Sequence, residues 1–250
     1  MEKVGLIPCA GEGSRLGLPF AKEMFPNIHK SYYSPIIMYT IDAMQKAGIN
    51  HLIFTINPQK TDLLKFLGNG KKFGMEFTYC IHPEPRSLPE SINEAYHLTK
   101  DKTVVFAMPD TYVQPGNFLD ILITEHKSNL NRTVTLGCFP TNNPAKFGMV
   151  EFKDDLVLGI ADKPLVTNLK WMWGAMVWNP KFTEEIKKFV AAATESHATA
   201  KEIILTDALK PLINEKKVYC YCFKGGSYKD LGTYDEIREW AKESGSGFTL

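Results

Sequence analysis

Residues 4–17 read VGLIPCAGEGSRLG and join a short apolar run to a glycine-rich turn. The run Val4–Pro8 is typical of a buried strand. In the turn Ala10–Gly17, glycines let backbone N–H groups approach an anion with no Cβ in the way, and Arg15 can add a planar cationic fork. Because open α/β sheets bind ligands at the carboxyl ends of their strands, this stretch predicts a strand followed by a phosphate-binding loop.

Strand and helix patterns alternate from this loop to Met108. Alternation of this kind predicts a parallel sheet covered by helices on both faces. The expected strands are Val4–Pro8, His51–Ile56, Glu76–Ile81 and Thr103–Met108, and the expected helices are Pro35–Ala47, Thr61–Leu67 with Thr61 as candidate N-cap, and Ser87–Thr99.

Strand patterns dominate the second half of the chain, with little helix between them. We expect an α/β fold with a Rossmann-like, mostly parallel central sheet, helices on both faces, and a smaller mixed β region in the second half. The expected elements there are the strands Thr133–Cys138, Met149–Phe152, Leu156–Ile160, Trp171–Trp178 and Val218–Phe223, and the helices Lys181–Ala193, 206–214 and Tyr234–Lys242.

Composition limits the classes of partner. The 250 residues carry 29 basic and 28 acidic side chains, so neither nucleic acid nor a membrane surface is expected as a partner. The five cysteines are few and odd in number, and Cys220 and Cys222 share one face of a strand, so we interpret all five as reduced thiols. The first apolar run is too short for a signal peptide or a membrane span, which predicts a cytoplasmic protein.

The glycine loop alone leaves alternatives open. A Rossmann dinucleotide fingerprint needs a helix that continues from the glycines, and Pro19 and Pro26 interrupt any such helix. A Walker A loop needs Gly-Lys-Ser or Gly-Lys-Thr, which this loop lacks. A tight turn without a ligand stays open for the loop taken by itself.

Lys22 extends the pattern beyond the loop. The segment Ala10–Leu16, followed by a proline and then Lys22, resembles the sugar-1-phosphate nucleotidyltransferase family, in which A-G-x-G-[ST]-R-[LM] precedes P-K; here Phe20-Ala21 separates the proline from the lysine. The resemblance implies a glycosyltransferase-A-like fold. It also implies that Arg15 and Lys22 are catalytic and that the NTP phosphates lie on Ala10, Gly11, Gly13 and Ser14.

Two aspartates far apart in the sequence are candidate metal ligands. Asp110 follows an expected strand, and Asp230 precedes Leu231-Gly232-Thr233 and an expected helix. Taken alone, either aspartate could instead cap a helix or a turn. In the family, aspartates in a P-D or G-D element and in a W-x-D-x-G-T element hold the metal, so the resemblance implies Mg²⁺ on Asp110 and Asp230. Magnesium favours such a site, because it prefers one or two carboxylates with phosphate oxygens and water.

The second half also matches the acceptor side of the family. Lys146-Phe147-Gly148, Asp162-Lys163-Pro164 and Trp173-Gly174-Ala175 resemble its [RK]-[YF]-G, E-K-P and small-residue elements. Thr206-Asp207 resembles a helix entry with Thr206 as cap. The resemblance implies that Lys163 binds the acceptor phosphate and that Gly148 leaves room for a sugar ring, within an acceptor set of Gly148, Asp162, Lys163 and Gly174.

Two departures from the family leave the substrates open. By resemblance, His82 and Ser87 belong to the base-recognition segment, where relatives have a glutamine and a glycine, so dTTP, UTP and CTP all stay open. Trp171 and Trp173 add bulk to a strand that is often slimmer in the family. The acceptor is therefore expected to be a sugar 1-phosphate, a smaller phosphate, or not a sugar.

The resemblance implies a magnesium-dependent enzyme that joins an NTP and a sugar 1-phosphate to give an NDP-sugar and pyrophosphate. One domain over residues 1–250 is expected, with a nucleotide-side half at about 1–112, an acceptor-side half at about 113–240 and a disordered tail at 244–250. One alternative is a cytidylyltransferase for a non-sugar phosphate or phosphonate, and another is a catalytically silent nucleotide-sugar-binding regulatory subunit. A homo-oligomer is compatible with either function.

Overall fold

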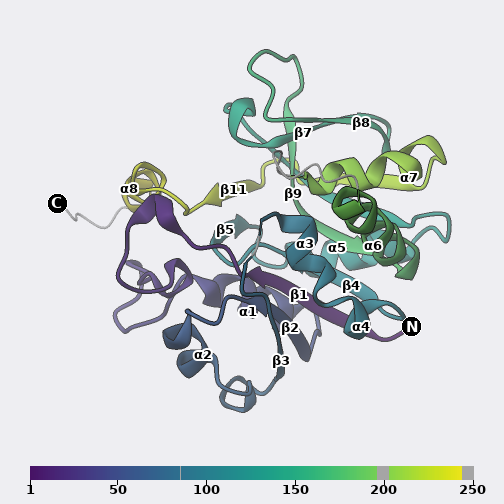
Figure 1. Ribbon diagram of the computed structural model, residues 1–250. Coiled ribbons are helices and arrows are strands. Elements are labelled where there is room, and N and C mark those ends of the chain that lie inside the picture. The colour runs from purple at the N-terminus through teal and green to yellow at the C-terminus, as the bar shows by residue number, and fades with distance from the viewer. Residues whose placement is uncertain (85, 196–202, 244–250) are drawn as a thin grey trace.

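A mixed sheet runs through the molecule (Figure 1). It has nine strands in the order β3-β2-β1-β4-β9-β6-β10-β8-β7. The computed structural model describes residues 1–84, 86–195 and 203–243. A separate two-stranded ribbon pairs β5 with β11. The strands are β1 (Lys3–Cys9), β2 (His51–Ile56), β3 (Glu76–Ile81), β4 (Thr103–Ala107), β5 (Thr111–Gln114), β6 (Val134–Pro140), β7 (Gly148–Lys153), β8 (Leu156–Asp162), β9 (Trp171–Trp178), β10 (Val218–Cys222) and β11 (Ser227–Asp230).

Strands β1 to β4 form the parallel part of the sheet, with β1 between β2 and β4. The side chains of β1 alternate between two core clusters: Val4 and Leu6 pack on one face, and Ile7 and Cys9 pack on the other. A strand that is covered on both faces needs a near-continuous apolar run. This is why the sequence before the glycine loop lacks polar alternation.

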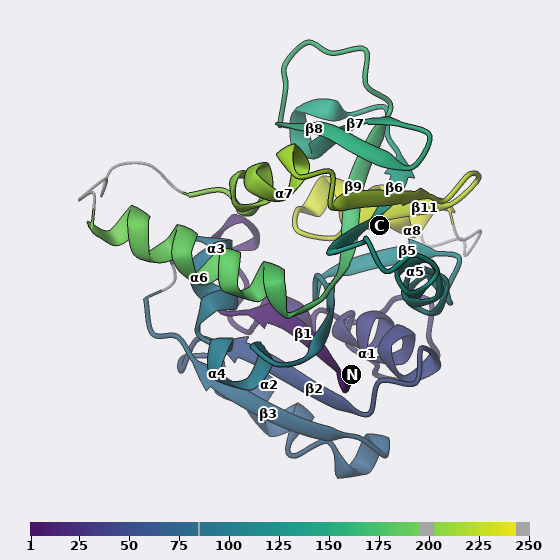
Figure 2. The same cartoon turned by 90° about the vertical axis from the view of Figure 1, so that its right-hand side faces the viewer.

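Helices lie on both faces of the sheet (Figure 2). One face is covered by α1, α2 and α5, and the opposite face by α3, α6 and α7. The helices of the described residues are α1 (Ile37–Lys46), α2 (Thr61–Leu67), α3 (Leu88–Asn93), α4 (Tyr96–Thr99), α5 (Phe118–Lys127), α6 (Pro180–Glu195), α7 (Lys210–Asn214) and α8 (Tyr234–Glu243), with 3₁₀ turns η1 (Ser14–Leu16), η2 (Lys22–Met24), η3 (Lys71–Phe73), η4 (Pro144–Lys146) and η5 (Leu205–Leu209).

The second half of the chain continues the same sheet. Strand β9 runs antiparallel to both β4 and β6, and β10 runs parallel to β6. The antiparallel pair β7 and β8 closes the far edge. The predicted α/β class, with a parallel half, helices on both faces and a mixed second half, is therefore confirmed.

Helix α5 and strands β5 and β11 were not predicted from the sequence. In α5 the buried residues Phe118, Leu119, Leu122 and Ile123 repeat at helical spacing, so a local signal was present. Strands β5 and β11 have four residues each and pair with each other across more than a hundred residues of sequence. Their pairing is a product of tertiary structure, and no local pattern indicates it.

Three predictions about helices need correction. Helix α2 begins at Thr61 itself, and the capping position is Lys60, so Thr61 is not the N-cap. The predicted helix Ser87–Thr99 is two helices, α3 and α4, and Ser87 caps α3 by accepting a hydrogen bond from the Glu90 N–H. Thr206 is not a cap either, because it lies buried inside η5. The predicted disordered tail, 244–250, lies outside the described residues.

Neither a membrane-spanning helix nor a disulfide occurs in the described part of the chain. None of its helices combines the length and the apolar composition that crossing a bilayer requires. All five cysteines are free, as predicted; Cys9, Cys80, Cys138 and Cys220 are buried, and Cys222 is half-buried.

The close packing of β1 against its neighbours predicts that a larger side chain at Gly5 destabilises the core. A Cβ on Gly5 would lie 2.4 Å from Leu52 and 3.1 Å from Met44 of α1. We expect Gly5→Val to lower the free energy of unfolding by about 1–3 kcal/mol, because the core has no room for the branched side chain. Gly159→Val in β8 is the control, since a Cβ there meets only Glu151 at 3.6 Å. Urea unfolding that gave equal losses for both variants would contradict this packing.

Candidate active site

Lys22 and Asp110 form an ion pair at the carboxyl end of the parallel strands. The Lys22 Nζ donates to the Asp110 Oδ2 at 2.5 Å, and the two side chains are only 15% and 4% exposed. Lys22 lies in η2, and Asp110 follows β4. The stem of Lys22 packs on Gly13, whose φ of +70° suits glycine and where a Cβ would lie 3.3 Å from the lysine methylenes. The predicted cation thus lies against the predicted glycine loop.

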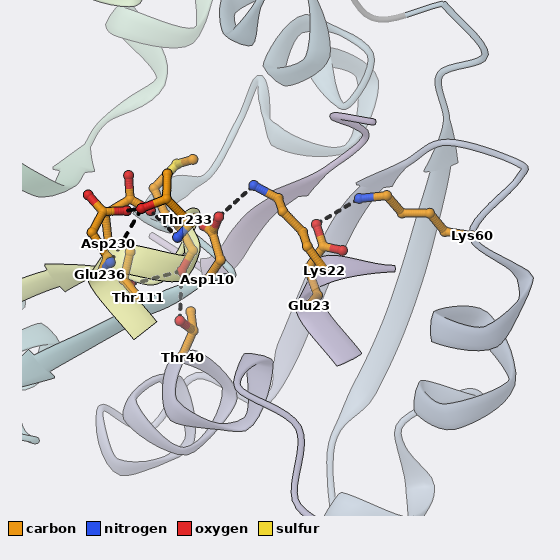
Figure 3. A network of polar contacts seen from close by, with 11 residues as sticks. Lys22, Glu23, Thr40, Lys60, Asp110, Thr111, Asp230, Thr233 and Glu236 are labelled. Carbon is orange, nitrogen blue, oxygen red and sulfur yellow. Dashed lines mark hydrogen bonds and ion pairs between the residues drawn. The ribbon is translucent and has the colours of Figure 1, made fainter. Parts of the chain in front are cut away.

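The β5–β11 ribbon brings the second aspartate to the same place (Figure 3). In the ribbon, Asp230 pairs with Thr111, the residue after Asp110. The Leu231 N–H donates to the Asp110 carbonyl oxygen at 2.9 Å. Two acids that lie far apart in the sequence therefore flank one point, as expected from the sequence.

Arg15 completes this cluster of charges. It lies in η1, directly after the glycines. Its Nη2 would lie 3.2 Å from a Cβ on Gly232, so the guanidinium rests against the turn that follows Asp230. Of the other predicted loop residues, Ala10 is buried at the end of β1, Gly11 is exposed, and Ser14 begins η1. The structure thus gathers Arg15, Lys22 and both aspartates around the loop.

The charges of this cluster shift its pKa values. Burial, then the neighbouring carboxylates of Asp110 and Glu236, raise the pKa of Asp230 from 3.8 to about 6, against the opposing effect of Lys22 and Arg15. Burial by itself would lower the pKa of Lys22, but the charges of Asp110 and Glu23 raise it above its ordinary value. Lys22 therefore stays protonated at neutral pH.

Glu236 is a member of this cluster that the sequence analysis did not single out. The Thr233 hydroxyl donates to the Glu236 Oε2 at 2.8 Å and accepts from the Glu236 N–H at 3.4 Å. These two hydrogen bonds cap the first turn of α8. A threonine three residues before a glutamate is a capping-box pattern, so a signal was present in the sequence. Glu236 also pairs with Lys146 at 2.9 Å, which connects α8 to the acceptor side.

The residues present fit a magnesium ion bound together with phosphate. Among the described residues, no group of three or more His, Cys, Asp or Glu is arranged to hold a metal. Asp110 and Asp230 nevertheless offer hard oxygen ligands, and a bound cation would offset the burial and the neighbouring carboxylates that raise the pKa of Asp230. Magnesium is commonly held by one or two carboxylates and the substrate phosphates.

A buried ion pair behind Lys22 was also not anticipated. Glu23 is fully buried, and the Lys60 Nζ donates to its Oε1 at 2.7 Å (Figure 3). The Ala21 N–H donates to the Asp62 Oδ2 of α2 at 2.8 Å. These contacts fix the residues on both sides of Lys22 to the start of α2. No sequence pattern links Glu23 to Lys60, because only the fold brings them together.

A cavity of about 400 Å³ adjoins Asp230 on the acceptor side. Its lining includes the predicted Gly148, Asp162 and Lys163, together with Trp173. Lys163 has a φ of +45°, unusual for a residue with a side chain, and its N–H donates to the Phe147 carbonyl oxygen at 3.0 Å. The structure therefore gathers three of the four predicted acceptor residues in one cavity.

Two glycines of the acceptor prediction accommodate aromatic rings of the protein itself. A Cβ on Gly148 would lie 2.3 Å from the Trp173 indole nitrogen, so the indole occupies the space that was expected for a sugar ring. A Cβ on Gly174 would lie 2.5 Å from the Tyr228 ring, and Gly174 does not line the cavity. The wall of this cavity is therefore aromatic where the sequence suggested open space.

The predicted base-recognition residues lie beyond the end of β3. The His82 Nδ1 is buried and has no hydrogen-bond partner among the described residues. Ser87 is buried at the start of α3, where its hydroxyl serves as the helix cap. Of the two, His82 keeps a free polar atom for a ligand, whereas the Ser87 hydroxyl already has a partner.

The profile of a family described as nucleotidyl transferase matches residues 4–246. The chain belongs to this nucleotidyl transferase family. It is a nucleotidyltransferase, and the predicted enzyme class is confirmed. The predicted kinship with sugar-1-phosphate nucleotidyltransferases is confirmed as well.

Curated relatives of this nucleotidyltransferase match nearly all of it. A glucose-1-phosphate thymidylyltransferase of Neisseria meningitidis is 22% identical over 241 residues, covering 95% of this chain and 81% of the relative. The low-salt glycan biosynthesis nucleotidyltransferase Agl11 of Haloferax volcanii is 24% identical, covering 94% and 64%.

Solved structures share the fold of this nucleotidyltransferase. A UDP-glucose pyrophosphorylase in complex with UDP-glucose has a TM-score of 0.79 at 19% identity and covers 98% of both chains. A UTP-bound UGPase from Acinetobacter baumannii has a TM-score of 0.76 at 20% identity and covers 98% of this chain and 94% of its own. These similarities support the fold class, which was already evident from the sheet order.

The buried Glu23–Lys60 pair predicts a large penalty for losing one partner. Lys60→Met leaves a carboxylate buried without its counter-charge, and we expect the free energy of unfolding to fall by about 3–5 kcal/mol. Lys181→Met is the control, because the Lys181–Glu215 pair is about half exposed and should contribute at most about 1 kcal/mol. Glu23→Gln added to Lys60→Met should restore part of the loss. Equal urea midpoints for the two single variants would contradict this account.

Because the pKa of Asp230 is raised, removing its charge should stabilise the metal-free protein, and the gain in stability should depend on pH. Between pH 3.8 and about 6 the folded protein holds a proton on Asp230 that the unfolded chain has lost, so the contribution of this group to stability falls as the pH rises through that range. In chelator, Asp230→Asn should therefore melt higher than the parent at neutral pH, and the difference should vanish as the pH falls toward 3.8.

The asparagine keeps the oxygen that accepts from the Gly232 N–H at 2.9 Å, so the comparison isolates charge. Asp235→Asn, at an 87% exposed side chain in α8, is the control and should show no such pH trend. A lower melting temperature for Asp230→Asn at neutral pH would disprove the electrostatic account.

Proposed function

We propose that this chain is a magnesium-dependent enzyme that joins an NTP and a sugar 1-phosphate to give an NDP-sugar and pyrophosphate, as in nucleotide-sugar biosynthesis. The observation that carries the proposal is the convergence of Arg15, Lys22, Asp110 and Asp230 beside the glycine loop. The names of the curated relatives, glucose-1-phosphate thymidylyltransferases among them, support the same reaction.

In this proposal the protein acts mainly by placing charge. Backbone N–H groups of Gly11 and Gly13 and the side chain of Arg15 hold the triphosphate. The Lys22 ammonium neutralises charge at the α-phosphate as the acceptor oxygen attacks in line and pyrophosphate leaves. Before substrate arrives, Asp110 balances the charge of Lys22. When magnesium is bound by Asp110 and Asp230, it supplies Lewis-acid stabilisation of the phosphate oxygens.

The acceptor is held on the other side of Asp230. Lys163 binds the acceptor phosphate as a point cation, and Asp162 accepts hydrogen bonds from acceptor hydroxyls. Both residues line the 400 Å³ cavity. A phosphate dianion is already deprotonated near neutral pH, so no general base is needed. This agrees with a site built from lysines, an arginine and carboxylates.

The aromatic wall favours a second candidate, a transferase for a compact, non-sugar phosphate or phosphonate. Trp173 fills the space above Gly148, which reduces the room for a hexose ring. His82 supplies the unpaired buried nitrogen for a base whose identity stays open. A matrix of dTTP, UTP and CTP against sugar 1-phosphates and small phosphates, read as pyrophosphate release, separates the two candidates. A silent regulatory subunit would release none in any combination.

We also propose that the chain forms a single domain and acts in the cytoplasm. A single domain is supported by one sheet that contains strands from both halves of the chain. A cytoplasmic location is supported by five unpaired cysteines, which oxidising compartments disfavour. A homo-oligomer agrees with either candidate reaction.

The proposal predicts that the central ion pair is indispensable for turnover. Lys22→Ala and Asp110→Ala should each lower pyrophosphate release by about 100-fold or more, because each removes preorganised charge from the reacting phosphates. Lys188→Ala, at a 70% exposed side chain in α6, is the control and should keep full activity. Circular dichroism confirms that each variant is folded. Near-normal rates for both site variants would refute the assigned roles.

A further inference from the structure

Three cysteines gather on one face of the sheet, outside the site described above. Cys138 lies in β6, and Cys220 and Cys222 lie in β10. The two strands are parallel neighbours, and their register places Cys138 directly opposite Cys222. All three thiols belong to or pack against the same core cluster, so they point to the same side. A cross-strand thiol pair is therefore present, with a third thiol next to it.

The three thiols differ in their access to solvent. Cys138 is fully buried and Cys220 is 4% exposed, whereas Cys222, at the end of β10, is half-buried. A small oxidant from solution therefore reaches Cys222 first. Cys138 lies behind it, shielded from solvent but adjacent in the sheet.

The electrostatic environment lowers the pKa of Cys222, the less buried member of the pair. Hydrogen bonds from Cys138 and from Cys220, helped by the charge of Lys224, lower the pKa of Cys222 to about 4 in spite of its partial burial. Burial raises the pKa of Cys138 well above its ordinary value. The thiolate is the nucleophilic form of a cysteine, so Cys222 reacts with peroxide first, and Cys138 gives up its proton only when it attacks the oxidised Cys222.

The backbone geometry favours a bridge between Cys138 and Cys222 over one between Cys220 and Cys222 within β10. Neighbouring strands lie about 4.8 Å apart, inside the range of about 4.4–6.8 Å for the Cα atoms of a disulfide. Cys220 lies opposite Leu136, on the same face as the pair and two residues before Cys222 in β10. Two residues along one strand, Cys220 and Cys222, are about 6.6 Å apart, at the far limit of that range.

We propose that Cys138 and Cys222 form a peroxide-reactive site that closes to a disulfide. The Cys222 thiolate attacks one oxygen of hydrogen peroxide, breaks the O–O bond and becomes a sulfenic acid, and the hydroxide released takes a proton to form water. The Cys138 sulfur then attacks the Cys222 sulfur, the S–O bond breaks, and a second water leaves with the Cys138 proton. Together the two thiols lose two electrons, and the peroxide gains them.

The site adjoins the acceptor cavity through the sheet. Cys138 pairs with Cys222 on one side and with Trp173 of β9 on the other. Trp173 in turn forms the aromatic wall above Gly148. The disulfide would therefore form one strand away from that wall. The proposal itself depends only on the thiols, so it can be tested independently of the proposed reaction.

The experiment exposes the full chain to a slight excess of hydrogen peroxide, blocks the remaining thiols with N-ethylmaleimide, and maps the products by mass spectrometry. The expected product is one intramolecular Cys138–Cys222 disulfide per chain, with Cys9, Cys80 and Cys220 alkylated after unfolding, and dithiothreitol should reverse it. A Cys138–Cys220 bridge, a disulfide between chains, or no loss of thiols would overturn the proposal.

Three variants assign the roles. Cys222→Ser should slow peroxide-dependent thiol loss at least about tenfold, because the reactive thiolate is gone. Cys138→Ala should stop at a Cys222 sulfenic acid that dimedone captures. Cys220→Ser is the matched control and should still form the disulfide. If Cys138→Ala does not fold, the Cys222→Ser and Cys220→Ser comparison decides, and equal rates for those two would overturn the proposal.

Discussion

The structure of the site depends on one constraint: Lys22 and Asp110 are withdrawn from water together and neutralise each other. Either charge alone would be costly at this depth, because removing an ion from water is repaid only by a close counter-charge. The pair joins the segment after the glycine loop to the end of β4 at 2.5 Å. It therefore brings into contact two segments that the sequence separates by a large part of the parallel sheet. Any ligand that enters here meets an ammonium and a carboxylate that are already in position.

Other elements hold this pair from three directions. The Glu23–Lys60 pair fixes η2 to the start of α2 from behind. The β5–β11 ribbon brings Asp230 to the front and, through the Leu231 N–H, holds the Asp110 backbone. A small apolar cluster that includes Leu16, Leu231 and Trp240 packs the glycine loop against α8. The site is thus preorganised by core packing on both sides of the loop, and the polar groups that remain exposed to a ligand belong to short, well-anchored turns.

Much of this could be predicted from the sequence, for definable reasons. Strand β1 is buried on both faces, so its apolar run is visible locally, and a strand-end aspartate such as Asp110 shows its position directly. The β5–β11 ribbon could not be seen, because four-residue strands carry little pattern and form only through their partner. The Glu23–Lys60 pair could not be seen either, since a glutamate and a lysine look like surface residues until the fold buries them. Motif spacing found the charged residues that converge beside the glycine loop, and it did not find the residues that hold them there.

The acceptor wall shows why even a correct motif can mislead about space. Gly137 of β6 pairs with Ala175, and Cys138 pairs with Trp173, so Gly174 has no partner on β6. In a regular ladder, Cys138 would face Gly174, and Trp173 would point to the opposite side of the sheet with Phe139. The extra residue puts Trp173 on the same face of the sheet as Cys138, where its indole covers Gly148. Gly148 and Gly174, which suggested open space in the sequence, are thus covered by aromatic rings in the fold. A one-residue shift in strand register therefore places the Trp173 indole over Gly148, and the residues of the motif do not encode that shift.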